Sequence, residues 1–255
     1  MYLMEINVKK MRYFLIPKLM LLSKIAISQI MLPAYQGVVS KIPTVAVMSC
    51  PGLATVTDVD NNFYNTVLIG TQCWMASNLR VTKYNNGTII PLDNSGGTTG
   101  DGSTETWTAR TSGALTVYAH NSSNLTAYGY LYNWYAATDT KKICPTGWHV
   151  PSNAEWTTLT TFLGGLTVAG GKMKSTGTTY WTSPNTGAEN SRGFSALPGG
   201  VRFKGAGGAF GYIRSFARFW SSNAGYFYQM DFDDINVTQG TCGTSCGHSV
   251  RCLRD

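Results

Sequence analysis

Charged side chains are scarce in this 255-residue chain, in which Asp, Glu, Lys and Arg together make up only 13% of the residues. Glycine and tyrosine, by contrast, occur 28 and 14 times. Such a composition is typical of a β- and loop-rich extracellular domain and disfavours a helical cytosolic enzyme. After the N-terminal region no run of about 18 apolar residues occurs, so the sequence predicts no further membrane-spanning helix. The length allows one large domain or two small ones.

Signs of catalytic chemistry are also few. The chain has no H-E-x-x-H motif and no glycine-rich phosphate-binding loop. Its three histidines are scattered, and we expect His149, without an acidic or basic neighbour, to be a packed bend residue. A glycosidase needs paired carboxylates across a cleft, whereas Asp231 and Asp233 share one face of a predicted strand. The sequence therefore favours a protein that is not an enzyme.

The positive charge is concentrated at the N-terminus. Of the net charge of +7, residues 1–49 carry +5, from six basic side chains and one acidic one. The rest of the chain carries only +2, from 14 basic and 12 acidic side chains. A nucleic-acid-binding domain is expected to hold its basic excess in the folded part. We therefore expect no nucleic-acid partner.

Residues 1–29 are predicted to be a signal peptide or another N-terminal leader. Basic residues at 9–12 precede an apolar stretch and small residues at 26–28, which is the pattern of a secretory signal. Pro17 and Lys18 interrupt the apolar part, and an amphipathic helix or a disordered tail is the alternative. Residues 30–49 are predicted to be a linker, and residues 50–255 the folded domain. The expected location is outside the cell or at its surface, with membrane contact only through export or attachment.

Six cysteines follow the predicted leader: Cys50, Cys73, Cys144, Cys242, Cys246 and Cys252. With export, this even number predicts up to three disulfides, and six reduced thiols in a cytosolic protein are the alternative. Cys242 and Cys246 also form a C-x3-C pair, but zinc would need two more ligands. His248 and Cys252 straddle a predicted strand and are expected to face different directions. We therefore expect no metal and no cofactor.

Two local patterns predict secondary structure. Residues 55–62 and 64–70 are predicted to form a hairpin. The Asp58–Asn62 segment resembles the start of a calcium loop, but the sixth and twelfth positions hold Phe63 and Ile69, so we expect a turn. Farther along, Ser152 and Glu155 form a capping box, which predicts a helix from Ser152. Its apolar face is Trp156, Leu159 and Leu163, and it is expected to end at Gly164-Gly165.

Six phrases occur in a fixed order along the chain. They are IGTQCWMASNL (69–79), YGYLYNWYAA (128–137), CPTGWHVPSNAEW (144–156), GFSALPGGVR (193–202), FWSS (219–222) and HSVRCLRD (248–255). Together they closely resemble the Fibrobacter succinogenes major paralogous domain, which is found in secreted proteins of Bacteroidetes and their relatives. That family is similar in fold to C-type-lectin-like proteins and to the formylglycine-generating-enzyme group. The resemblance, over residues 50–255, implies an α+β domain with two helices, a small twisted antiparallel sheet and long loops over one face.

The resemblance also implies a pairing of the cysteines. In C-type-lectin-like domains a disulfide ties a helical region to the last strand, and Cys144 with Cys252 fits this link. Cys50 and Cys73 flank the first hairpin and are expected to pair. Cys242 and Cys246 would then close a small loop.

A ligand-binding face is predicted between the FWSS and HSVRC phrases and just before them. Tyrosine offers a large contact area at low entropy cost, Asn and Asp add hydrogen bonds, and Arg beside aromatic rings suits sugars, carboxylates or proteins. The candidate residues are Tyr212, Arg214, Arg218, Tyr226, Tyr228, Asp231, Asp233 and Asn236. Because side chains alternate along a strand, up to half of them are expected to point inward, and an ordinary strand and loop is the alternative.

Calcium-dependent sugar binding is a less favoured version of the same hypothesis. The Glu-Pro-Asn or Gln-Pro-Asp and Trp-Asn-Asp triplets of calcium-dependent C-type lectins do not occur. Asp231, Asp233 and Asp234 still offer oxygen ligands for a hard cation.

The predicted function is thus a secreted, non-catalytic surface protein that binds a glycan or a protein ligand. One alternative is an enzyme on a scaffold like that of the formylglycine-generating enzyme, although the Cys242/Cys246 pair lacks matching surroundings. A second is a structural or adhesive subunit of a cell surface or a phage tail. In some lectin-fold proteins, diversity-generating retroelements randomise codons near the C-terminus, and the residue types between the two fixed phrases fit such a target.

Overall fold

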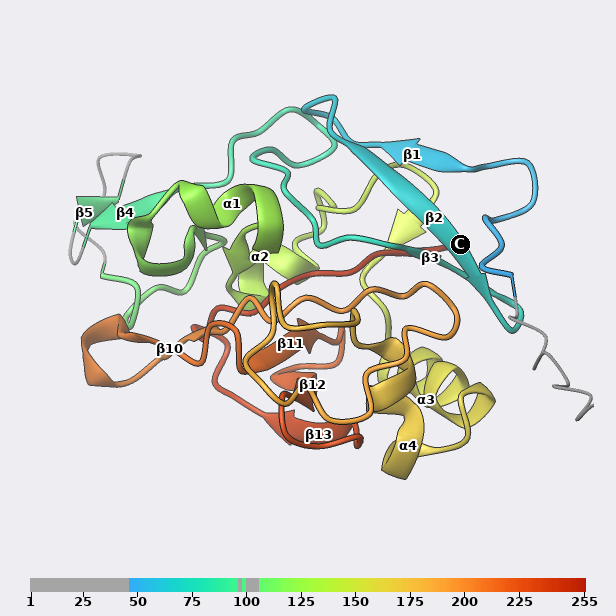
Figure 1. Ribbon diagram of the computed structural model, residues 1–255. Helices are drawn as coiled ribbons and strands as arrows, with labels where there is room; N and C mark the ends of the chain where they lie inside the picture. Colours follow the sequence, from blue (N-terminus) through green and yellow to red (C-terminus); the bar gives the residue numbers. More distant parts are fainter. Residues whose placement is uncertain (1–45, 96–97, 100–105) are drawn as a thin grey trace, which may run out of the picture. The chain divides into compact units, whose positions relative to one another are not determined.

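The computed structural model describes residues 46–95, 98–99 and 106–255 (Figure 1). These residues belong to one unit, Pro43–Asp255. The expected leader at 1–29 and most of the expected linker at 30–49 lie outside the described residues. Short antiparallel strands dominate, accompanied by α-helices, which confirms the α+β class.

A five-stranded antiparallel sheet joins segments that are far apart in the sequence (Figure 1). Its order is β1 (Thr55–Thr57), β2 (Phe63–Ile69), β3 (Gln72–Met75), β14 (Leu253–Arg254) and β8 (Trp148–His149). Leu253 of β14 pairs with Trp74 on one side and with His149 on the other. The last strand is therefore held inside the sheet and not at its edge.

The predicted first hairpin is confirmed as β1 and β2. Its turn is closed by Asp58, whose Oδ1 accepts hydrogen bonds from the backbone N–H groups of Asp60 and Asn62, each at 2.9 Å. Such a side-chain-closed turn is the structure expected for this Asp/Asn cluster.

The described residues contain four α-helices, two more than expected. They are α1 (Ser123–Tyr128), α2 (Trp134–Thr138), α3 (Asn153–Phe162) and α4 (Leu166–Met173). The capping box of Ser152 and Glu155 at the start of α3 is confirmed. The short α2 begins because the Asn133 side chain accepts a hydrogen bond from the Ala136 N–H at 2.9 Å, which caps a helix of only five residues.

A second sheet lies against α3 and α4 (Figure 1). It consists of β11 (Phe216–Trp220), β12 (Tyr226–Asp231) and β13 (Thr238–Thr241) in that order. Three two-stranded pairs complete the described sheets: β4 (Asp93–Ser95) with β5 (Thr98–Thr99), β6 (Leu115–Thr116) with β7 (Leu131–Tyr132), and β9 (Val201–Arg202) with β10 (Phe210–Gly211).

Aromatic rings fill the core between the two larger sheets and α3. Trp156 of α3 lies 5.0 Å from Trp74 of β3 and stacks on Tyr228 of β12 at 4.9 Å, measured between ring centroids. Phe194 and Phe219 pack against the same tryptophan at 6.1 and 6.0 Å. Rings at these separations contribute about 0.5–1.5 kcal/mol per pair beyond their buried area.

The three disulfides are the expected pairs. Cys144–Cys252 joins residues 108 apart in sequence, Cys50–Cys73 joins residues 23 apart, and Cys242–Cys246 closes a turn with a separation of 4. Cys144 precedes β8 and Cys252 immediately precedes β14, so this link clamps two neighbouring strands of the five-stranded sheet.

The expectation that His149 lacks charged partners is wrong. Its Nε2 lies 2.9 Å from Oε1 of Glu155, and its Nδ1 lies 2.6 Å from Oδ1 of Asp255. Burial alone would lower the pKa of His149, but the hydrogen bonds to the two carboxylates raise it above its ordinary value. The sheet pairing of β8 with β14 brings Asp255 to a histidine 106 positions earlier, which local sequence cannot reveal.

Candidate functional site

One face of the β11–β12 pair carries a row of half-buried aromatic and polar side chains, next to the exposed ring of Tyr212. The register places Phe216 opposite Asp231 and Arg218 opposite Gln229. Because side chains alternate, these four share one face, and the intervening Ala217, Phe219, Tyr228 and Met230 point into the core. We call Tyr212, Phe216, Arg218, Gln229 and Asp231 the ladder face.

Tyr212 forms the aromatic part of the ladder face. It lies in the turn before β11, and its ring stacks on that of Phe216 with centroids 4.2 Å apart and planes 23° apart. Nearly half of the Tyr212 surface, 49%, is exposed. An exposed ring that is already fixed by stacking loses little conformational entropy when a ligand packs on it.

A hydrogen-bonded chain forms the polar part. Arg218 Nε donates to Oε1 of Gln229, and Gln229 Nε2 donates to Oδ1 of Asp231 at 2.5 Å. Burial lowers the pKa of Arg218, which the nearby Asp231 carboxylate opposes. Burial also raises the pKa of Asp231, although the hydrogen bond from Gln229 lowers it in part. The hydrogen-bonded side chains of Arg218, Gln229 and Asp231 thus place a guanidinium, an amide and a carboxyl group in a fixed order beside the stacked rings of Tyr212 and Phe216.

Only Tyr212, Arg218 and Asp231 of the eight predicted residues meet on this face. Tyr226 is exposed, but it lies two residues before Tyr228 and therefore on the same side of β12, opposite the ladder face. Tyr228 itself, 2% exposed, is a core residue, which corrects its assignment as a ligand-binding residue.

The other three predicted residues point elsewhere. Arg214 donates to the backbone carbonyls of Thr178 and Thr179 at 3.0 and 2.9 Å. Asn236 donates through its side chain to the Asp234 carboxylate at 2.8 Å. Asp233 is exposed in the loop after β12. Sequence reasoning missed Phe216 and Gln229, although their two-residue spacing from Arg218 and Asp231 is the signal that they share a strand face.

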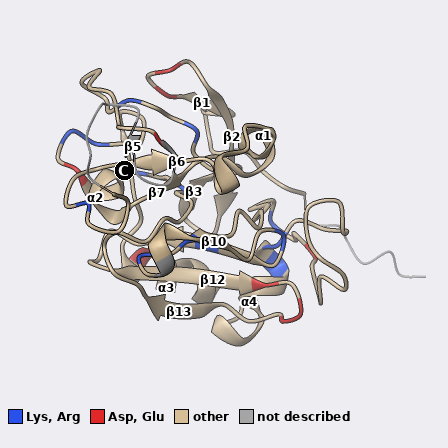
Figure 2. Cartoon of the chain, turned by 90° about the vertical axis from the view of Figure 1, so that its left-hand side faces the viewer, with Lys and Arg blue, Asp and Glu red and all other residues tan. Residues whose placement is uncertain are grey.

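A buried lysine lies under the acidic loop that follows β12, where acidic positions gather (Figure 2). The Lys174 ammonium donates to the carbonyls of Thr186, Asp231 and Asp234 at 2.9, 2.8 and 2.6 Å. Burial lowers the pKa of Lys174 to about 8, and the nearby Asp234 and Asp231 carboxylates oppose this. The Lys174 ammonium therefore lies where the three loop carbonyls converge. Because these oxygens accept hydrogen bonds from Lys174, they are not available as ligands for a metal ion.

We expect Lys174→Met to lower the free energy of unfolding by about 2–4 kcal/mol, because it removes the buried ammonium that donates to three carbonyls. Lys172→Met is the matched control: Lys172 lies in the last turn of α4, two residues before Lys174, and its half-buried ammonium donates to one carbonyl among the described residues, that of Leu163, at 2.8 Å. Urea unfolding followed by tryptophan fluorescence compares the two. Equal stability losses would contradict the anchoring role of Lys174.

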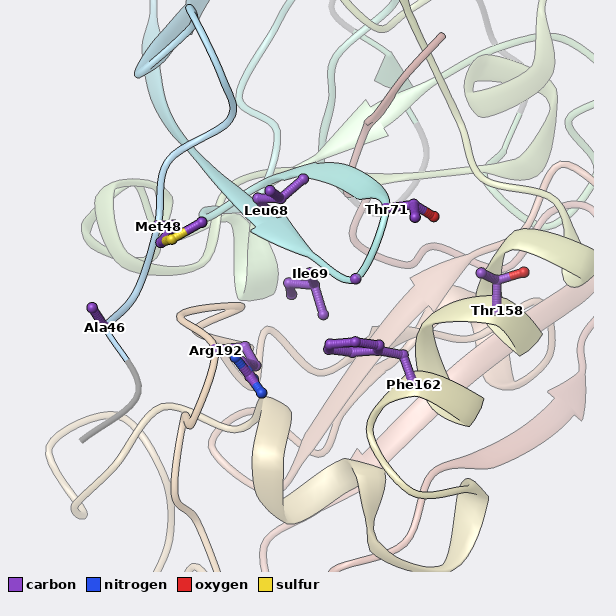
Figure 3. A pocket seen from close by; sticks show the side chains of 9 residues that line it. Ala46, Met48, Leu68, Ile69, Thr71, Thr158, Phe162 and Arg192 are labelled. Atoms are coloured by element: carbon purple, nitrogen blue, oxygen red, sulfur yellow. The ribbon is translucent and has the colours of Figure 1, made fainter. Parts of the chain in front are cut away.

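A separate apolar pocket of about 480 Å³ lies between α3, the β2–β3 turn and the start of the described chain (Figure 3). Phe162, 49% exposed, and Ile69 line it, and the Arg192 guanidinium lies 5.4 Å from the Phe162 ring centroid. None of the predicted ligand-binding residues lines this pocket. Phe162 was missed because it lies off the apolar face of α3 that packs into the core.

The turn Gly243–Gly247 has the letters of a G-x-S-x-G motif, which would place a nucleophilic serine at a strand-to-helix elbow. Ser245 does not fit this role. It is buried, its hydroxyl donates to the Arg110 carbonyl at 3.1 Å, and the turn leads into an extended segment instead of a helix. The motif is therefore no evidence for a serine hydrolase.

These features describe an α+β domain with three disulfides and a half-buried aromatic and polar sheet face beside an exposed tyrosine. The family model of the Fibrobacter succinogenes major domain matches residues 67–254, and the chain therefore belongs to this family. No curated protein and no solved structure matches the chain. Among the described helices, none has the length and apolar character to cross a membrane.

Proposed function

We propose that the chain is a secreted, non-catalytic binding protein whose ladder face holds a glycan. The observation that carries this proposal is the stacking of the exposed Tyr212 on the half-buried Phe216, beside the hydrogen-bonded Arg218, Gln229 and Asp231 side chains. A sugar ring offers apolar C–H faces that pack on an aromatic ring and hydroxyls that pair with planar polar groups. A fixed aromatic platform next to a guanidinium, an amide and a carboxyl group complements both.

A C-type-lectin-like arrangement is part of the same proposal. It is supported by the Cys144–Cys252 disulfide, which links the segment before α3 to the last strand, and by β14 lying between β3 and β8. Export is supported by the pairing of all six cysteines, since disulfides persist in oxidising compartments.

The test is a glycan array probed with the full chain, followed by calorimetric titration of each ligand found. We expect Tyr212→Ala to weaken binding by about tenfold or more, because a stacked ring contributes on the order of 1 kcal/mol beyond its area. Phe63→Ala is the matched control, because Phe63 is also aromatic and is 70% exposed on β2 of the other sheet. EDTA is expected to leave binding unchanged, since Lys174 already engages the loop carbonyls.

Three outcomes would contradict this function. Ligand binding that survives both Tyr212→Ala and Asp231→Asn would exclude the ladder face as the site. Loss of binding in Phe63→Ala alone would move the site to the five-stranded sheet. Turnover of a bound glycan would indicate an enzyme.

A further inference from the structure

The turn between β13 and β14 brings together three side chains that bind soft metal ions. Sγ of Cys242, Sγ of Cys246 and a ring nitrogen of His248 all lie within 4.8 Å of one another. The other nearby cysteine, Cys252, is bonded to Cys144 instead. His248 therefore lies beside the C-x3-C pair, whereas Cys252 does not.

His248 is fully buried, and neither of its ring nitrogens has a hydrogen-bond partner within the part of the chain that the structure describes. Its ring packs between those of Trp220 and Phe227, with centroids 4.3 and 4.8 Å away. A buried polar side chain without partners costs free energy and needs a reason. Both ring nitrogens therefore remain without a protein partner among the described residues, beside the two cysteine sulfurs.

The backbone around the two cysteines is held independently of their disulfide. The Cys242 N–H donates to the Gly225 carbonyl at 2.8 Å, and the Thr244 carbonyl accepts from the Trp134 N–H at 2.9 Å. His248 exchanges two backbone hydrogen bonds with Tyr132, at 3.0 and 2.9 Å. The three ligands are therefore expected to stay close together after the sulfur–sulfur bond is opened.

We expect Cys242–Cys246 to be the disulfide that a reductant opens first. Cys242 is half-buried, whereas the other five cysteines are buried. In the chain-entropy model, the loop closed by this disulfide, with a sequence separation of 4, stabilises the fold less than the loop closed by Cys144–Cys252, with a separation of 108.

We propose that reduction of Cys242–Cys246 creates a site for one thiophilic cation, with Zn²⁺ as its simplest occupant. A dithiol reductant breaks the sulfur–sulfur bond, becomes a cyclic disulfide itself, and leaves one proton on each cysteine sulfur. Zn²⁺ then displaces both protons and binds two thiolates and the neutral imidazole of His248. Two cysteines and one histidine are a known ligand set for zinc with one open position, here on the half-buried side of Cys242.

The test titrates the full chain with limiting dithiothreitol and maps the released thiols by alkylation and peptide analysis. Cys242 and Cys246 are expected to react first. Equilibrium dialysis should then give one Zn²⁺ per reduced chain and none per oxidised chain. Co²⁺ in place of Zn²⁺ should produce a thiolate charge-transfer band.

His248→Phe keeps the two cysteine thiols and an aromatic ring in the same place. Loss of a residue that only hydrogen-bonds to a metal ligand weakens metal binding by roughly 10- to 100-fold. Because His248 is itself a proposed ligand, we expect His248→Phe to weaken Zn²⁺ binding by more than this. Cys242→Ser should abolish the cobalt band of a two-thiolate site. Circular dichroism confirms folding of each variant, and the wild-type cobalt spectrum supplies a readout that needs no variant. The proposal is overturned if the reduced wild type binds no Zn²⁺, if His248→Phe binds it equally well, or if Cys144–Cys252 opens first.

Discussion

Replacing Arg251 with methionine is expected to lower the free energy of unfolding by about 3–5 kcal/mol, because it strips several buried acceptors of their donor. Arg251 is fully buried. Its Nη1 donates to the carbonyls of Met75 and Phe194, and its Nη2 donates to Oδ1 of Asn78 at 2.8 Å. One side chain thus ties the end of β3 to two other segments of the chain.

The guanidinium has no carboxylate partner among the described residues. Instead it lies over the rings of Phe194 and Phe219, at 4.5 and 5.2 Å from their centroids. Burial lowers the pKa of Arg251 to about 9, so the group is still charged at neutral pH. Carbonyl dipoles and ring faces therefore compensate this charge, and a methionine of similar length reproduces neither interaction.

Arg254→Met is the matched control, because Arg254 lies on the same terminal segment with an exposed side chain. Chemical unfolding followed by fluorescence should show a large loss for Arg251→Met and a change within about 0.5 kcal/mol for Arg254→Met, as is usual for surface positions. Arg251→Lys keeps the charge but not the planar fork of donors, so an intermediate loss is expected. Wild-type stability in Arg251→Met would contradict the role assigned to the buried guanidinium.

Local chemistry is the part of this fold that the sequence predicts well. The two residues of the capping box at Ser152 are three positions apart in the sequence. The hydrogen bonds that close the Asp58 turn join residues at most four positions apart. Both were predicted correctly because the interacting groups are neighbours along the chain.

Long-range register limits the rest of the prediction. The residue types on β12 indicated a recognition surface, but only the pairing of β11 with β12 shows that Asp231 joins Arg218 while Tyr228 enters the core. His149 and its partner Asp255 are likewise joined by the pairing of β8 with β14. A shift of one residue in either strand would exchange the two faces, and composition does not encode that choice.

Removing the Cys144–Cys252 disulfide by a double substitution to alanine is expected to have the largest effect of all. The chain-entropy model assigns about 5 kcal/mol to a loop of roughly 100 residues, which rivals the total stability of many domains. The link also clamps β8 to β14, and Leu253 of β14 pairs directly with His149 of β8. Without it, the last strand is held between β3 and β8 by short ladders and by the hydrogen bonds of Arg251.

The matched control is the double alanine variant of Cys242 and Cys246, for which the same model predicts only about 2 kcal/mol. Unfolding in guanidinium chloride, with each variant purified under oxidising conditions, measures the difference directly. Because both variants lose one disulfide, shared effects of cysteine removal cancel, and the remaining difference reports loop length and the clamp on the sheet. Equal losses in the free energy of unfolding would mean that the Cys144–Cys252 disulfide stabilises the fold no more than the short-loop Cys242–Cys246 disulfide does. The position of β14 would then depend on the buried Arg251 and the aromatic core instead.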